Sequence, residues 1–379
     1  MSTSPASLLL PSPQNRRAAA EQFSFANQWL VAHRPEKAVP FLLHCCRLDP
    51  SNLIYRQSLR DAQHGLSPKT GLFARIRKWS TLQRLKHSLH AKNWPNVLEA
   101  AEAVLCLDAS NATAHLALTD AFEAMGLLEQ ALWCLEQMEV GGNTGEVIKA
   151  KLVGLYERAG RFSRAKEVTS APKLLDAEAE TQARLLREQI AVTPTSAQLY
   201  VQLIHVYRAA GDQDAARAWL LRGLTATVND FELALEQAQM DLTTLREDAA
   251  IAEQRLANDP TSQELTALLD RARHEIQCRT IDLCRQRADR YASEKRWRLE
   301  LGVELLKAGQ FDAALEAFAE ARSDDKLAWR ALVYAGYCHV NRKQMRKAAP
   351  FFEEALPLIP PEAEATRKEV EALLAQWRA

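Results

Sequence analysis

Large apolar residues and small residues recur along this chain at spacings that predict pairs of short antiparallel helices. The clearest pair is marked by Leu301, Gly302, Gly309, Phe311, Ala314, Phe318 and Ala321. The pattern returns 34 residues later, where Gly336 corresponds to Gly302 and Phe352 corresponds to Phe318. A constant offset of this size predicts a fold of similar helical units stacked on one another.

The same pattern marks other parts of the chain. Five more segments carry it, at residues 25–50, 82–108, 118–135, 152–169 and 200–220. Gly160 follows Gly126 at the same 34-residue offset, whereas the segment 82–108 lacks a turn glycine. We expect small residues where two helices cross closely, aromatic residues between the crossings, and a left-handed glycine where the first helix of a pair ends.

These residues and spacings resemble the tetratricopeptide-repeat superfamily. The resemblance covers about seven units, at residues 19–52, 78–179, 197–230 and 295–362. The first unit has a Cys-Cys-Arg-Leu-Asp-Pro-Ser-Asn-Leu run ahead of a basic segment, which is similar to large bacterial tetratricopeptide proteins. The resemblance implies an all-α, right-handed α-solenoid with a concave surface formed by the first helix of each repeat.

Residues 231–294 depart from the repeat pattern. Their apolar positions alternate in steps of four and three from Phe231 to Leu256, and the rhythm resumes from Leu265 after a turn at Pro260. This heptad pattern predicts a long, coiled-coil-like helical hairpin inserted into the solenoid. Two degenerate repeats are the alternative, because Pro260 stands where a repeat-closing proline belongs. The hairpin could form a homodimer, but its Ala-rich seam favours bracing of the solenoid.

The segment 69–92 has basic residues and no Asp or Glu. Its basic patch comprises Arg75, Arg77, Lys78, Arg84 and Lys86. Apolar residues, Trp79 among them, recur at three- and four-residue steps, so the segment predicts a basic amphipathic helix or two short ones. Such a helix could bind nucleic acid or an anionic membrane surface. We expect instead that its apolar stripe is buried against the next repeat.

The resemblance also indicates where a partner would bind. Members of the superfamily hold an extended peptide or a partner helix in the concave groove, at positions one and two turns along each first helix. Here those positions are Asn27, Lys86, Asp120, Glu157, His205, Arg208, Arg296, Arg330 and Tyr337. Phe23 stands where a clamp for chaperone C-termini would need lysine, so we reject that specificity. Arg296 and Arg330 occupy equivalent positions and could share one acidic ligand, but two independent, exposed helix-start arginines are the favoured interpretation.

The expected organisation therefore has seven parts. They are a disordered tail (1–17), a first repeat (18–52), a helical basic connector (53–77), a central repeat array (78–230), the long hairpin (231–294), a C-terminal repeat pair (295–362) and a capping helix (363–379). The last is expected to cover the apolar end of the solenoid with residues such as Val370 and Leu374.

Composition limits the remaining functions. Lys plus Arg and Asp plus Glu number 48 each, so no overall field attracts a polyanion. Seven cysteines without a Cys-x-x-Cys pair argue against a disulfide framework and a zinc site, and favour a cytoplasmic location. His44, Cys45 and Cys46 are adjacent on one helix and cannot face each other as base and nucleophile. We expect no enzyme activity and no cofactor, and we predict a scaffold that binds a protein or peptide.

Overall fold

The structure, a computed structural model, describes residues 11–64, 72–140, 145–169 and 176–378, and within these ranges every element is a helix. The chain divides into two compact units, Met1–Ser170 and Ala171–Ala379. We describe each unit by itself. The domain boundaries given above stay predictions, since this division is coarser and falls within the predicted central array.

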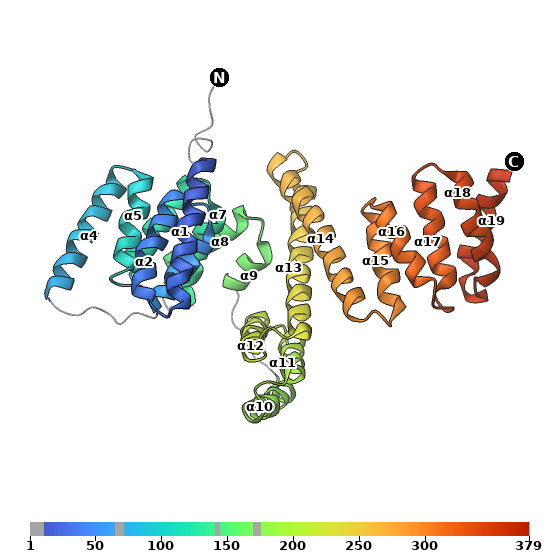
Figure 1. Ribbon diagram of the computed structural model, residues 1–379, viewed down its shortest axis with the longest axis horizontal. Coiled ribbons are helices and arrows are strands. Elements are labelled where there is room, and N and C mark those ends of the chain that lie inside the picture. Colours follow the sequence, from blue (N-terminus) through green and yellow to red (C-terminus); the bar gives the residue numbers. More distant parts are fainter. Residues whose placement is uncertain (1–10, 65–71, 141–144, 170–175, 379) are drawn as a thin grey trace, which may run out of the picture. The chain divides into compact units, whose positions relative to one another are not determined.

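The first unit consists of helical pairs (Figure 1). Its helices are α1 (Pro13–Val31), α2 (Pro35–Leu48), α3 (Leu53–His64), α4 (Leu72–His90), α5 (Trp94–Leu105), α6 (Ala112–Ala124), α7 (Leu128–Val140), α8 (Glu146–Arg158) and α9 (Phe162–Thr169). α1 packs on α2, α4 on α5, α6 on α7, and α8 on α9. α3 stands outside this pairing and packs on α2.

The second unit contains helical pairs on both sides of two longer helices (Figure 1). Its α-helices are α10 (Ala177–Val192), α11 (Ala197–Ala209), α12 (Gln213–Ala226), α13 (Phe231–Asn258), α14 (Gln263–Arg290), α15 (Lys295–Lys307), α16 (Phe311–Ala321), α17 (Ala328–Asn341), α18 (Met345–Ala355) and α19 (Glu364–Arg378). Two short 3₁₀ turns, Leu356–Leu358 and Pro361–Ala363, lead into α19.

Close helix packing explains the small residues of the repeat pattern. A Cβ atom added to Gly336 would lie 2.7 Å from the ring of Phe352, and one added to Gly302 would meet Phe318 more closely still. No real Cβ approaches a ring at such distances, so only glycine lets the two helices pack here. The turn glycines behave as expected, for Gly126 and Gly309 have φ values of 74° and 72°. Where the unit 82–108 lacks a glycine, Lys92 takes the left-handed conformation, with φ 50°.

The two ends of the described chain are both helical. α1 begins at Pro13, where the Ser12 side chain accepts a hydrogen bond from the Asn15 amide. Residues 13–17 are therefore helical, whereas the sequence predicted a disordered tail over residues 1–17. This start is an N-cap with proline in the first turn, a signal that the Ser- and Pro-rich composition had hidden. Residues 1–10 lie outside the described ranges. At the other end, α19 buries Val370 and Leu374 against Phe352 and Ile359, as a capping helix should.

The predicted hairpin is a pair of long helices. α13 and α14 have 28 residues each, against 13 in α11 and α15, and they pack along each other as the yellow and light-orange pair of Figure 1. Two degenerate repeats that have lost their internal turns would give helices of the same length, so the lengths do not decide between this alternative and one inserted hairpin. Leu235, Leu242 and Leu283 form the buried centre of the pair. α13 also packs on α11 and α12, and α14 packs on α15, so the pair connects the repeats that flank it. Its coiled-coil character stays a prediction.

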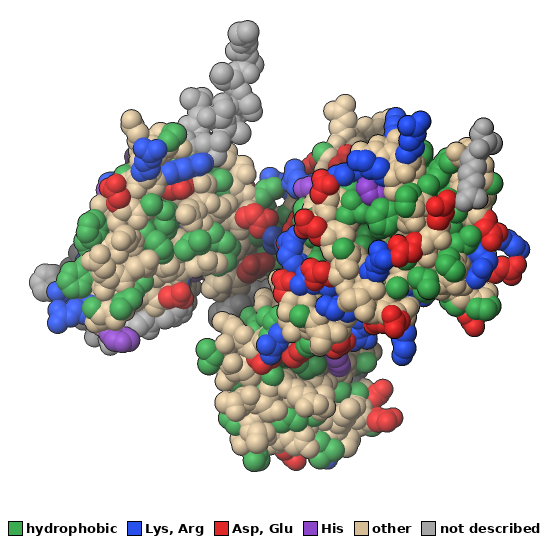
Figure 2. Space-filling view, turned by 45° about the vertical axis from the view of Figure 1, so that its right-hand side comes forward, with side chains coloured by type: hydrophobic (Ala, Val, Ile, Leu, Met, Phe, Trp, Pro, Cys, Tyr) green, Lys and Arg blue, Asp and Glu red, His purple; other side chains and the backbone are tan. Residues whose placement is uncertain are grey.

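Charged side chains of both signs are interspersed over the face shown in Figure 2, consistent with the equal numbers of acidic and basic residues. Within the described ranges, no helix combines the length and apolar character needed to cross a membrane.

Candidate partner-binding groove

A groove of about 590 Å³ lies within the second unit, where the two long helices meet the first helices of the repeats around them. Four arginines line it, and we call it the arginine groove: Arg208 on α11, Arg246 on α13, Arg287 on α14 and Arg330 on α17. Apolar side chains, Leu242 and Leu299 among them, also line it. The groove therefore combines apolar and cationic lining groups.

Three of these arginines have no carboxylate partner in the part of the chain that the structure describes. Arg208 donates to Glu236 at 3.1 Å and is neutralised by it. Arg246 donates a hydrogen bond to the Thr280 hydroxyl at 3.5 Å. Arg287 and Arg330 lie over tryptophan rings, as described next. Among the described residues, no carboxylate lies within ion-pair distance of Arg246, Arg287 or Arg330.

Aromatic rings hold two of the unpaired guanidiniums in place. Arg287 lies 5.0 Å from the ring centroid of Trp297, and Arg330 lies 5.2 Å from that of Trp329. A guanidinium stacked on a ring keeps its edge N–H groups free to donate. Both arginines can therefore bind a carboxylate without first losing an ion pair.

Acidic residues at the groove reduce its charge without cancelling it. Glu300 and Glu304 both line the groove. Glu304 pairs with Lys307 at 2.7 Å, so it contributes little net charge. Three unpaired arginines then face one unpaired carboxylate, that of Glu300, and the groove keeps a positive excess.

The structure brings together two of the predicted groove residues, Arg208 and Arg330. Sequence reasoning missed Arg246 and Arg287, because it treated the hairpin as a brace. A signal was present for Arg246, which stands four residues after the predicted seam residue Leu242 and so lies on the same face of its helix. Arg287 stands four residues after Leu283, whose burial with Leu242 only the structure shows. An arginine four residues after a buried leucine of the helical pair could have been assigned to the groove.

The other predicted partner-binding residues lie elsewhere. Asn27, Lys86, Asp120 and Glu157 belong to the first unit, where Asp120 forms an ion pair with Lys151. In the second unit, His205 lies 3.1 Å from Glu236, outside the groove lining.

Arg296 and Tyr337 also do not line the groove. Arg296 pairs with Glu294 at 2.6 Å, so it is not free to share a ligand with Arg330. Tyr337 packs edge-on against Phe352, and burial together with a hydrogen bond to Glu369 raises the pKa of its hydroxyl.

The basic segment is partly neutralised. Lys78 pairs with Asp108 at 2.7 Å and Arg84 pairs with Glu99 at 2.9 Å, while Arg77 and Lys86 are exposed. The side chain of Arg75 lies outside the described residues. Leu82, Leu85 and Leu89 pack into the core as expected. Trp79 does not, because its side chain is 64% exposed. The apolar positions before Arg77 lie outside the described side chains.

Of the candidates for catalysis, Cys45 and Cys46 are buried in the core and His44 is half-buried. Burial raises the pKa of the Cys45 and Cys46 thiols to about 11 and about 12, which keeps both protonated near neutral pH. The His44 ring nitrogen Nδ1 accepts a hydrogen bond from Arg47. Among the described side chains, no three His, Cys, Asp or Glu residues are grouped so that they could hold a metal ion.

The comparison with protein families identifies the repeats near the C-terminal end of the second unit. Residues 299–363, which span α15 to α18, match the model of a tetratricopeptide repeat family. The chain carries tetratricopeptide repeats. Proteins built from tetratricopeptide repeats generally serve as non-catalytic scaffolds for other proteins. No curated protein matches the sequence.

Several solved structures resemble the tetratricopeptide-repeat chain. MamA is 22% identical, with a TM-score of 0.28, over 43% of this chain and 91% of its own. The human IFIT1 dimer with m7Gppp-AAAA is 13% identical, with a TM-score of 0.33, over 99% and 87%. A tetratricopeptide repeat protein from Parabacteroides merdae ATCC 43184 is 12% identical, with a TM-score of 0.22, over 79% and 98%. At these values the similarities say nothing about the partner of this chain.

Proposed function

We propose that this protein is a non-catalytic scaffold whose arginine groove binds an acidic segment of a partner protein. The observation that carries the proposal is the set of three arginines, Arg246, Arg287 and Arg330, that share one groove and have no carboxylate partner. Arginine presents its N–H groups in a planar fork that matches a carboxylate. Groups spaced along a groove favour an extended or helical segment over a small molecule.

Two features favour a polypeptide over a nucleic acid. Glu300, the unpaired carboxylate of the groove lining, would repel a continuous phosphate backbone. The apolar lining residues Leu242 and Leu299 instead suit a segment that mixes acidic and apolar residues. In the basic segment, Lys78 and Arg84 are already paired, so the alternative of a nucleic-acid or membrane surface there is not favoured. We place the protein in the cytoplasm, since none of its seven cysteines forms a disulfide.

The direct test measures binding of a defined acidic peptide. A fluorescein-labelled peptide of alternating Glu and Leu is titrated with the wild type and with the triple variant Arg246→Glu, Arg287→Glu, Arg330→Glu, and anisotropy is followed. Three lost ion pairs of about 0.5 kcal/mol each weaken binding about tenfold, and charge reversal adds to this loss.

The matched control reverses three exposed arginines of the same unit that do not line the groove, Arg222, Arg271 and Arg285. It changes the net charge equally and is expected to bind the peptide nearly as well as the wild type. An equal loss of peptide binding in both variants would show that overall charge alone causes the effect. Unchanged peptide binding by the groove variant would refute the proposal.

A further inference from the structure

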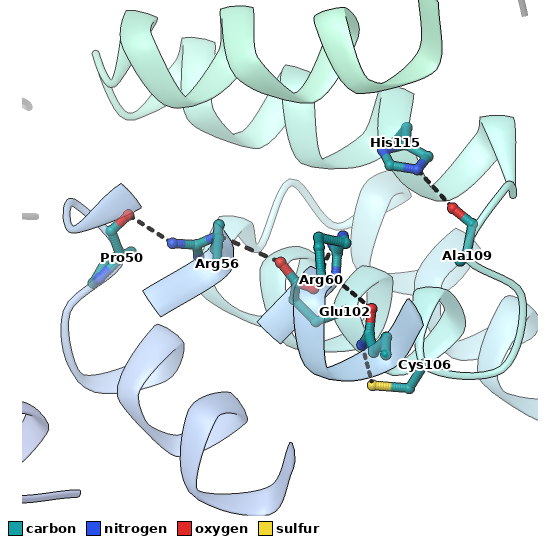
Figure 3. A network of polar contacts seen from close by, with 8 residues as sticks. Pro50, Arg56, Arg60, Glu102, Cys106, Ala109 and His115 are labelled. Atoms are coloured by element: carbon teal, nitrogen blue, oxygen red, sulfur yellow. Dashed lines mark hydrogen bonds and ion pairs between the residues drawn. The ribbon is translucent and has the colours of Figure 1, made fainter. Parts of the chain in front are cut away.

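The first unit contains a cluster of buried charges that the proposed scaffold function does not use. Arg56 and Arg60, one turn apart on α3, both reach Glu102 on α5 (Figure 3). Arg60 Nη2 lies 2.7 Å from Glu102 Oε2, and Arg56 Nε lies 3.4 Å from Glu102 Oε1. The side chain of Arg56 is 0% exposed and that of Glu102 is 3% exposed. Two buried guanidiniums therefore share one carboxylate.

The protein does not neutralise the second arginine. Arg56 donates from Nη1 to the Pro50 carbonyl at 2.9 Å and lies over the Phe122 ring, but its Nη2 and Nε have no hydrogen-bond partner among the described residues. Asp49 is also buried, yet its carboxylate accepts from Ser51 and forms no ion pair with either arginine. The cluster thus keeps a net charge of about +1 in a medium of low dielectric constant, which is costly unless an anion balances it.

Neighbouring titratable groups do not supply that anion. Burial raises the pKa of the thiols of Cys46 and Cys134 to about 12, so both are neutral. Burial also raises the pKa of the Cys106 thiol, which accepts a hydrogen bond from Gln63. Burial lowers the pKa of His115, which adds no positive charge at neutral pH.

A cavity of about 620 Å³ adjoins this cluster, within the first unit. Arg56 and Glu102 belong to its lining. Most of its wall is apolar and is formed by Pro40, Leu43, Leu48, Pro95, Leu98 and Met125. Arg47 and His44 are its other basic side chains. The volume is in the range of small-molecule sites in proteins, and the walls are mainly of the apolar kind that such sites use.

We infer that this cavity binds a small carboxylic acid with an apolar body. The apolar walls accept the body of the ligand, and its carboxylate faces the side of the cavity that Arg56 lines. Because Arg56 is covered from water, its charge acts through the protein interior, where screening is weak. The same apolar walls disfavour a small hydrated anion, which would lose its water without gaining apolar contact. This site is independent of the arginine groove, which lies in the other unit.

The test compares ligands that differ only in the acid group. Decanoate, decanol and acetate are titrated into the full-length protein by calorimetry, with thermal melting as a second readout. Decanoate is expected to bind at least about tenfold more tightly than decanol and to raise the melting temperature, whereas acetate is expected not to bind. A short peptide with a free carboxylate on a C-terminal leucine is a further arm. Binding of this peptide would identify the ligand class as a polypeptide C-terminus. A preference for decanoate over the peptide would identify it as a free fatty acid.

Two variants locate the site. Arg56→Met leaves Arg60 and Glu102 as a balanced pair, so the fold should be retained, while the preference for decanoate over decanol disappears. Ala103→Trp fills the cavity from a half-buried lining position. It should abolish binding of both decanoate and decanol, whether Arg56 is present or replaced by Met.

A spectroscopic measurement separates acid recognition from simple apolar uptake. The carboxyl carbon of ¹³C-labelled decanoate is followed by NMR as pH is lowered. The pKa of the bound acid should lie below that of the free acid in the wild type, and this difference should vanish in Arg56→Met. Equal affinity for decanoate and decanol, or full decanoate binding in Ala103→Trp, would overturn the inference.

Discussion

Single residues at helix ends show how the repeat pattern tolerates exceptions. Gly126, Gly160, Gly211 and Gly309 all take the left-handed conformation at the turn within a helical pair. His33, Lys92 and Lys343 take the same conformation, with φ between 50° and 60°, although each carries a Cβ. The turn geometry is therefore imposed by the packing of the two helices, and these three residues bear a conformational cost that glycine avoids.

Lys92→Gly is expected to stabilise the first unit by about 1 kcal/mol, because the left-handed conformation costs a non-glycine residue roughly that much. Denaturant unfolding of the full-length protein measures the change. The matched control is Lys86→Gly, the same substitution within helix α4, which should instead destabilise by about 1 kcal/mol. Destabilisation by both substitutions would contradict the strain assigned to Lys92.

His115 makes the stability of the first unit depend on pH. Its side chain is buried, Nε2 hydrogen-bonds with the Ala109 carbonyl at 2.9 Å, and burial lowers its pKa from the ordinary value of 6.5. The unfolded chain therefore binds a proton that the folded chain does not, and stability falls as pH drops below about 6.5 towards the lower folded-state pKa. Below that value the loss is complete, and above about 6.5 it is absent.

His115→Gln should flatten this part of the pH profile. Unfolding is measured from pH 7.5 to 5, and the difference between the wild type and the variant should change most below about pH 6.5. Parallel profiles for the two proteins would show that His115 is not the group that titrates.

At the scale of elements, the paired long helices α13 and α14 join the repeats that flank them in the second unit. Leu242 and Leu283 lie in their shared centre. α13 contacts α11, and α14 contacts α15. The same helices supply Arg246 and Arg287 to the groove, so this helical pair positions two of its four arginines.

Leu283→Ala is expected to destabilise the helical pair by about 2 to 4 kcal/mol, because it removes a buried side chain from the centre of the pair. Hydrogen exchange should quicken in peptides from both α13 and α14. Leu221→Ala is the matched control, since Leu221 is exposed, and its effect should stay within about 0.5 kcal/mol. Faster exchange confined to α14 would mean that the two helices do not stabilise each other.

At the scale of the whole molecule, sequence reasoning could predict what depends on local spacing. The 34-residue offset between Gly302 and Gly336 gave the helical pairs, and both glycines meet a phenylalanine ring where the pattern requires it. The steps of three and four after Phe231 predicted two long helices. These features are readable because neighbouring helices in a repeat protein contact each other at nearly constant sequence separation.

Contacts between distant residues were not predictable in this way. Arg56 meets Glu102 from a helix outside the repeat pairs, and no periodicity relates their positions. The arginine groove likewise combines Arg208 on α11 with Arg330 on α17, and only the packing of the intervening hairpin places them around one space. The sequence predicts that each of these residues lies on a helix, whereas tertiary packing determines which side chains share a site.

The most direct test of the scaffold account is capture of the partner from cell lysate. Wild type, the groove variant Arg246→Glu, Arg287→Glu, Arg330→Glu, and a basic-segment variant Arg75→Glu, Arg77→Glu, Lys78→Glu are compared by mass spectrometry and nucleic-acid staining. The account predicts a defined protein with an acidic segment that is retained by the wild type and the basic-segment variant and lost from the groove variant. Retention by the groove variant, together with loss of bound material from the basic-segment variant, would contradict it.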